Sequence, residues 1–79
     1  MITVKETDYF KNWISNLGDR IARSIINARI RRLSIGNKGD SIYIGDGVSE
    51  LRIDYGPGYR VYYIKLNNTR NYYTSLWWR

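Results

Sequence analysis

Two arginines and a tyrosine, Arg52, Arg60 and Tyr62, are the side chains whose types and spacing could do chemistry in this chain. The sequence has no cysteine and no histidine, which excludes a thiol nucleophile, a serine–histidine–aspartate triad and the usual zinc sites. Acid–base steps would then fall to tyrosine, lysine, aspartate or glutamate, with arginine stabilising negative charge. Arginine grips phosphate through two donors, and tyrosine stacks on bases or donates a proton. We therefore expect RNA as the partner, without a metal or a cofactor.

The three residues lie on a predicted β-hairpin, with strands at 48–55 and 59–66 and a tight Gly-Pro-Gly loop at 56–58. If Tyr55 and Tyr59 close a three-residue loop, Asp54 faces Arg60 and Arg52 faces Tyr62 on one side. The other side is then an ordinary apolar core face, made by Leu51, Ile53, Val61 and Tyr63. The polar side is either an RNA-binding surface or a solvated surface with an Asp54–Arg60 ion pair, and the sequence leaves both open.

A positive charge favours the RNA interpretation. The 79 residues include 13 Lys and Arg against 7 Asp and Glu, a formal net charge of +6. Such a balance favours a polyanion, although it also keeps a small protein soluble. Further candidate RNA contacts are Arg31 on a basic helix surface, Lys38 in a glycine-rich loop, and Tyr59. We expect the basic helix and Lys38 to border the same cleft as the hairpin.

The remaining elements must position this hairpin. A short strand is predicted at residues 2–5, followed by a helix with Thr7 as N-cap and an apolar stripe from Phe10 to Leu17. Asp19 should cap a second helix, residues 20–33, which Gly36 ends. Its predicted buried side comprises Ile21, Ala22, Ile25, Ile26, Ile30 and Leu33. Residues 41–44 read as a short extended segment.

These elements predict one α+β domain over residues 1–79, in which an N-terminal strand and an antiparallel helical hairpin pack on a small, mostly antiparallel sheet. The sequence has no apolar run of the roughly 20 residues that a membrane span needs, and no secretory leader is expected. We therefore expect a cytoplasmic protein.

Residues 31–33, 36–40 and above all the run 45–63, Gly-Asp-Gly-Val-Ser-Glu-Leu-Arg-Ile-Asp-Tyr-Gly-Pro-Gly-Tyr-Arg-Val-Tyr-Tyr, resemble the RelE/ParE superfamily of toxins. The nearest branch is the HigB-like addiction module killer proteins. The resemblance covers roughly residues 3–65. It implies a RelE-like fold and the toxin of a type II toxin–antitoxin system.

RelE-type members cut mRNA in the ribosomal A site, where the 2′-hydroxyl attacks the adjacent phosphate without a metal ion. The resemblance therefore implies an endoribonuclease that inhibits translation, with the ribosome and mRNA as partners. It also implies a cognate antitoxin, often a helix-turn-helix protein in this branch. By motif, Arg60 matches the arginine that contacts the scissile phosphate, and Arg52 matches a functional Lys or Arg of the preceding strand. Tyr62 or Tyr59 would stack on or orient the substrate. Glu50 stands where some members carry another Lys.

The end of the sequence departs from the family. In place of an apolar strand, a Gly-Gly turn and a C-terminal helix with further catalytic groups, residues 70–79 read Arg-Asn-Tyr-Tyr-Thr-Ser-Leu-Trp-Trp-Arg. Two tryptophan codons read one base later encode Gly-Gly, so we expect a frameshifted, truncated C-terminus. This tail could still form an edge strand, and its aromatic residues could mediate a homodimer.

Three functions stay open at this point. The chain is an mRNA endonuclease weakened or inactivated by the loss of its C-terminal groups, a non-catalytic remnant that binds antitoxin or itself, or a ParE-type gyrase inhibitor.

Overall fold

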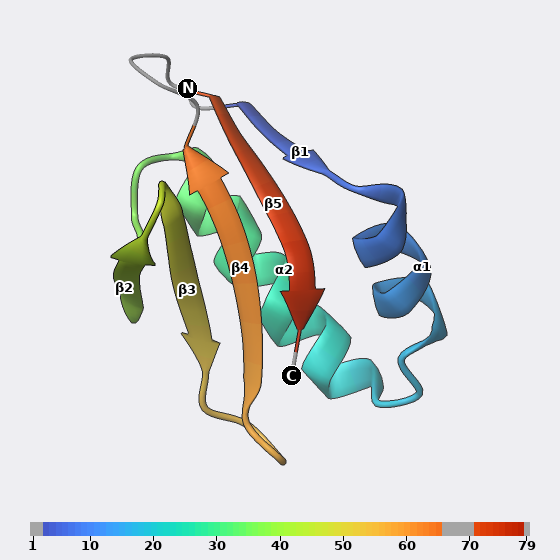
Figure 1. Ribbon diagram of the computed structural model, residues 1–79. Helices are drawn as coiled ribbons and strands as arrows, with labels where there is room; N and C mark the ends of the chain where they lie inside the picture. The colour runs from blue at the N-terminus through green and yellow to red at the C-terminus, as the bar shows by residue number, and fades with distance from the viewer. Residues whose placement is uncertain (1–2, 66–70, 79) are drawn as a thin grey trace.

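The computed structural model describes residues 3–65 and 71–78 and is an α+β domain. In chain order its elements are β1 (Thr3–Glu6), α1 (Asp8–Asn16), α2 (Arg20–Ser34), β2 (Ser41–Gly45), β3 (Val48–Ile53), β4 (Tyr59–Lys65) and β5 (Asn71–Trp78). The strands form one sheet in the order β1-β5-β4-β3-β2 (Figure 1). Three of its four strand pairs are antiparallel, and β1 with β5 is parallel. The predicted mostly antiparallel sheet is confirmed.

Local side-chain chemistry fixes where the two helices begin and end. Thr7 caps α1 by accepting a hydrogen bond from the Phe10 amide at 3.2 Å, and Asp19 caps α2 by accepting from Ile21 and Ala22. At the other end of α2, Gly36 adopts φ +88°, a left-handed conformation that glycine tolerates best. The amides of Gly36 and Asn37 donate back to the carbonyls of Leu33 and Arg32, which satisfies the end of the helix.

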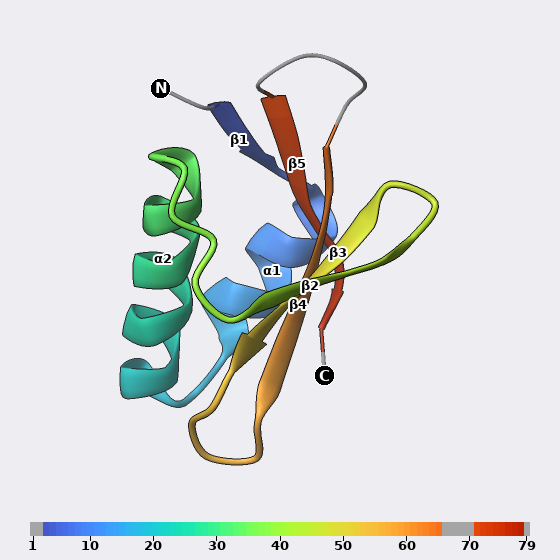
Figure 2. The same cartoon turned by 90° about the vertical axis from the view of Figure 1, so that its left-hand side faces the viewer.

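Both helices pack on one face of the sheet and leave the other face uncovered by either of them (Figure 2). The core lies between the layers and comprises Phe10, Ile14, Ala22, Ile26, Ile30, Leu33, Leu51, Ile53, Val61 and Tyr63. The prediction that Ile21 is buried was wrong, because 60% of it is exposed. Each residue turns a helix by about 100°, so Ile21 lies well round from the stripe that runs through Ala22, Ile26 and Leu33.

The β3–β4 hairpin has a longer loop than the sequence suggested. Five residues, 54–58, separate the strands, and Ile53 pairs with Tyr59, so the three-residue loop was a wrong prediction. The Gly58 amide donates to the Tyr55 carbonyl at 3.0 Å, and Gly56 at φ +58° turns the chain between them. The register therefore differs by two residues from the predicted one. Because side chains alternate with period two, a shift of two keeps every residue on its predicted face.

The tail segment is an interior strand, so the prediction of an edge strand was wrong. β5 pairs with β4 on one side and, in parallel, with β1 on the other. Its parallel neighbour comes from the far end of the chain, and local sequence carries no signal for such a pairing. The edges of the sheet are β1 and β2. The side chains of residues 71–78 lie outside what the structure describes, so a homodimer through the aromatic tail stays a prediction.

Neither α1 nor α2 has the length and apolar composition that a membrane span needs.

Candidate nucleic-acid interface

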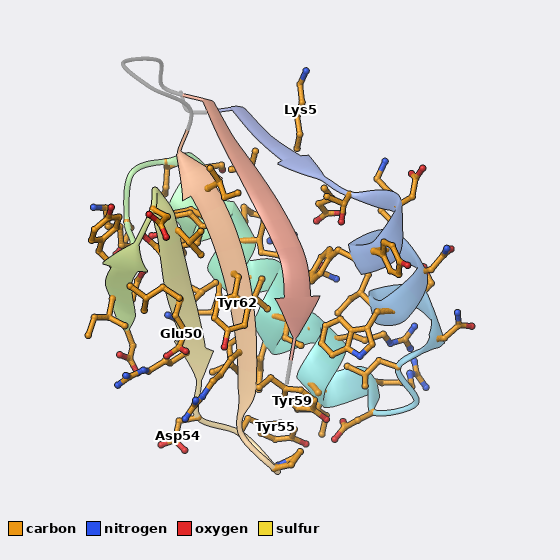
Figure 3. The ribbon with its side chains drawn as sticks, viewed as in Figure 1. Lys5, Glu50, Asp54, Tyr55, Tyr59 and Tyr62 are labelled. Carbon is orange, nitrogen blue, oxygen red and sulfur yellow. The ribbon has the colours of Figure 1, made fainter. Side chains whose placement is uncertain are left out.

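Four side chains form a square block on the uncovered face of the sheet, two from β3 and two from β4. Glu50 lies opposite Tyr62, and Arg52 lies opposite Arg60. In each strand the two residues are separated by one inward-facing residue, Leu51 or Val61, which is fully buried in the core. The buried side chains of Leu51 and Val61 therefore fix the two strands on the core, and the four side chains lie on the opposite face of the sheet. Figure 3 shows Glu50 and Tyr62 on this face. We refer to Glu50, Arg52, Arg60 and Tyr62 as the sheet block.

Glu50 connects the other three members of the sheet block. Its Oε1 accepts a hydrogen bond from Nε of Arg52 at 2.8 Å. Its Oε2 accepts from the phenol of Tyr62 at 3.2 Å and lies 3.9 Å from Nη1 of Arg60. The hydrogen bond from Arg52 has the largest influence and holds the pKa of Glu50 below its ordinary value. Burial opposes this change, and the Tyr62 hydrogen bond and the charge of Arg60 add to it.

The two arginines are paired with Glu50 but remain accessible. Their side chains are 48% and 50% exposed, whereas the side chain of Glu50 is 9% exposed. Like charges directly opposite each other on neighbouring strands repel, and Glu50 offsets this repulsion as an anion that Arg52 and Arg60 share. One carboxylate supplies a single negative charge to two guanidinium groups. Both guanidinium groups keep exposed donors that suit a phosphate, and the acidic residues Asp40 and Asp54 lie beside them.

A shallow hollow of ≈ 300 Å³ opens beside the arginines at the loop end of the hairpin. Arg52 and Arg60 line it together with Tyr59, Pro57 and the carboxylates of Asp40 and Asp54. The predicted Asp54–Arg60 ion pair does not form, because the longer loop places Asp54 beyond the last strand pair and Glu50 takes its role.

The structure separates the other predicted contacts from the sheet block. The side chain of Tyr59 lies against the core, with its ring 6.0 Å from Trp13 in an edge-on contact, and it reaches only the rim of the hollow. Arg31 is exposed on α2, the helix that covers the opposite face of the sheet. Lys38 is exposed in the loop before β2 and is not among the residues that line the hollow. The expected cleft shared by the basic helix and the hairpin is therefore absent from the described part of the chain.

Sequence reasoning missed two residues that organise this region. Glu50 appeared only as a departure from the family pattern, although its spacing of two from Arg52 already put both on one face. Arg29 of α2 donates hydrogen bonds to the Arg52 carbonyl at 2.6 Å and to the Asp40 carbonyl at 3.0 Å. These bonds connect α2 to β3 at the position of Arg52. A methyl group at Gly39 would lie 3.2 Å from the Arg29 guanidinium, a tight contact, and φ +61° at this position also favours glycine. No local sequence signal identifies Arg29.

Within residues 3–65 and 71–78, no group of three or more acidic, histidine or cysteine side chains is placed to hold a metal ion. The charged residues at the site are Arg52, Arg60 and Glu50, with Asp40 and Asp54 beside the hollow.

Comparisons with known proteins give one informative similarity. A protein of Haemophilus influenzae, described as "Uncharacterized protein", is 52% identical over 61 residues, which is 77% of this chain. The matched region spans 62% of the length of that relative. No family model matches the chain, and no solved structure matches it. A region similar to about three quarters of this chain therefore forms part of a longer protein in that bacterium.

Proposed function

We propose that this chain is a RelE-type toxin of a type II toxin–antitoxin system and that the sheet block binds mRNA in the ribosome for cleavage. The observation that carries this proposal is the placement of Arg52 and Arg60 directly opposite each other on an accessible sheet face, with Tyr62 next to Arg60 on the same strand. The order of strand, two helices and antiparallel sheet is compatible with the RelE-like fold that the sequence resembles. A cognate antitoxin, the ribosome and a cytoplasmic location belong to the same proposal.

The chemistry assigned to this site is attack of an RNA 2′-hydroxyl on the adjacent phosphate. A new bond forms between the 2′-oxygen and phosphorus as the 2′-hydroxyl gives up its proton. The bond from phosphorus to the 5′-oxygen of the next nucleotide breaks, and that oxygen takes up a proton, which leaves a 2′,3′-cyclic phosphate and a 5′-hydroxyl. Negative charge grows on the phosphate oxygens during this step, and a fixed guanidinium stabilises it. Arg60 takes this role, Arg52 holds the RNA backbone, and Tyr62 orients or stacks on the substrate.

The test is inducible expression of the chain in a bacterial host, followed by primer extension on a translated mRNA. The proposal expects growth arrest and new 5′ ends within codons, both of which disappear in Arg60→Ala. Arg20→Ala is the matched control, because Arg20 is an exposed arginine on α2, away from the sheet block. Its cleavage pattern should equal that of the wild type.

Two other outcomes would replace this proposal. Growth arrest with double-strand DNA breaks and intact mRNA would indicate a ParE-type gyrase inhibitor. Co-purification with an antitoxin without arrest or cleavage would indicate a binding remnant that has lost catalysis.

A further inference from the structure

Glu50 is the residue of the sheet block that the proposed reaction does not use. It is nevertheless the most buried of the four, with 7% of the residue exposed, whereas Arg52 and Arg60 are exposed. Its carboxylate uses both oxygens, one toward Arg52 and the other toward Tyr62 and Arg60. A buried carboxylate is unfavourable unless charged or hydrogen-bonding partners compensate its lost hydration, and here three partners do so. The contacts work in both directions, since each partner is also held by Glu50.

The alternation of the strands gives Glu50 this central position. It lies two residues from Arg52 along β3, directly opposite Tyr62, and diagonal to Arg60. Without a carboxylate there, the two guanidinium groups would face each other without the anion that both of them contact. Long arginine side chains then lose rotamer order, because mutual repulsion drives the charged ends apart.

We propose that Glu50 is a positioning residue, which sets the two guanidinium groups and the Tyr62 phenol in the arrangement that one RNA phosphodiester meets. This inference rests on the proposed function and deepens it, because it assigns the geometry of the site to a carboxylate. The Oε1 contact fixes the guanidinium plane of Arg52 through Nε, and the Oε2 contacts bring Arg60 and the Tyr62 hydroxyl to one point. Glu50 contacts neither substrate nor reacting atoms.

A carboxylate in a phosphate site has two opposed effects, and their opposition makes the proposal testable. Its negative charge weakens the attraction of the site for RNA. Its position orders the groups that stabilise the transition state, and misplacement by about 1 Å can cost on the order of a hundredfold in rate. Removing the charge should therefore improve binding while it slows cleavage. General unfolding would worsen both.

The experiment compares Glu50→Gln, Glu50→Asp and the wild type in two assays. The first is fluorescence anisotropy of a short fluorescein-labelled single-stranded RNA, and the second is single-turnover cleavage of mRNA on programmed ribosomes. Glu50→Gln should bind the oligonucleotide at least as tightly as wild type and cleave on the order of tenfold more slowly, or worse. Glu50→Asp keeps the charge but shortens the reach, so it should bind like wild type and cleave slowly.

Asp46→Asn is the charge-matched control. Asp46 is exposed in the β2–β3 turn at φ +54°, a left-handed conformation that asparagine also adopts readily. This variant changes the net charge as Glu50→Gln does but leaves the sheet block intact, so its cleavage rate should equal that of wild type. A Glu50→Gln enzyme that cleaves at the wild-type rate would overturn the proposal. So would parallel losses of binding, cleavage and folded fraction, measured by circular dichroism.

A spectroscopic measurement separates this inference from the proposed function. In ¹⁵N-labelled protein, the Nε–H resonance of Arg52 should move downfield through its hydrogen bond to Glu50 and should lose that shift in Glu50→Gln. If wild type does not cleave mRNA while the Arg52 Nε–H resonance loses its shift in Glu50→Gln, the proposed function fails and the role of Glu50 in positioning Arg52 stands. If wild type cleaves mRNA and the Arg52 resonance does not change, only the positioning role fails.

Discussion

Leu51 and Arg52 are neighbours in β3 that face opposite sides of the sheet, so replacing each with alanine tests the division between core and site. Leu51 is fully buried between the sheet and the helices. Truncation of a buried leucine costs about 2–5 kcal/mol, since it removes apolar contacts and leaves a cavity. At about 0.05–0.15 kcal/mol per residue, a domain of 79 residues has a total stability of about 4–12 kcal/mol. Leu51→Ala should therefore remove a large share of it.

Arg52→Ala should affect RNA binding more than stability. Its side chain is 48% exposed, so its truncation leaves no core cavity, and Glu50 keeps Tyr62 and Arg60 as partners; the denaturation midpoint should therefore fall less than in Leu51→Ala. Its affinity for RNA should fall, because one of the two phosphate-binding guanidinium groups is lost.

Urea denaturation followed by tryptophan fluorescence measures the loss of stability, because Trp13 is partly buried and packs against Phe10 and Tyr59 beside the core. Anisotropy with a labelled RNA measures the loss of affinity under conditions where both variants are folded. The reasoning is refuted if Arg52→Ala unfolds the domain or if Leu51→Ala is as stable as wild type. Either result would mean that the faces of β3 are assigned wrongly.

Three further predictions concern the carboxylate, a helix end and the free edge of the sheet. The pKa of Glu50 is below its ordinary value in the folded state, so its stabilising contribution is present above the unfolded-state pKa near 4.5 and is lost as pH falls through the folded-state value. Wild type should lose more unfolding free energy than Glu50→Gln when urea titrations are repeated below pH 4.5. Gly36→Ala should destabilise the domain by about 1 kcal/mol in the same assay because φ is +88°, whereas Gly18→Ala, with open space and no left-handed φ, should be nearly neutral. The edge strand β2 exposes three consecutive apolar residues, Ile42, Tyr43 and Ile44, so Ile44→Lys should reduce concentration-dependent association in sedimentation velocity; equal association of both proteins would exclude this edge.

The sequence correctly predicted the features that depend only on neighbouring residues. Thr7 and Asp19 cap the helices as their types predict, and Gly36 ends α2, because each acts within a few residues of itself. The position of β5 depended on a partner strand at the other end of the chain, so neither composition nor periodicity could locate it. The same limit applies to Arg29, whose partners are 11 and 23 residues away in sequence.

The sequence predicted which face of the hairpin Arg52, Arg60 and Tyr62 share, but it did not predict their contacts, and the hairpin explains why. Side chains alternate between the two faces of a strand. Arg52, Arg60 and Tyr62 therefore share a face even if the predicted register is wrong by an even number of residues. A register error of two residues does change which side chains face each other across the strands. In the actual register Arg60 lies opposite Arg52 and not opposite Asp54 as predicted. Alternation places Glu50 on the same face of β3 as Arg52, two residues away, and both arginines share its carboxylate. With the five-residue loop, the sequence would have indicated two opposed arginines with Glu50 beside them, because an acidic neighbour lowers their mutual repulsion.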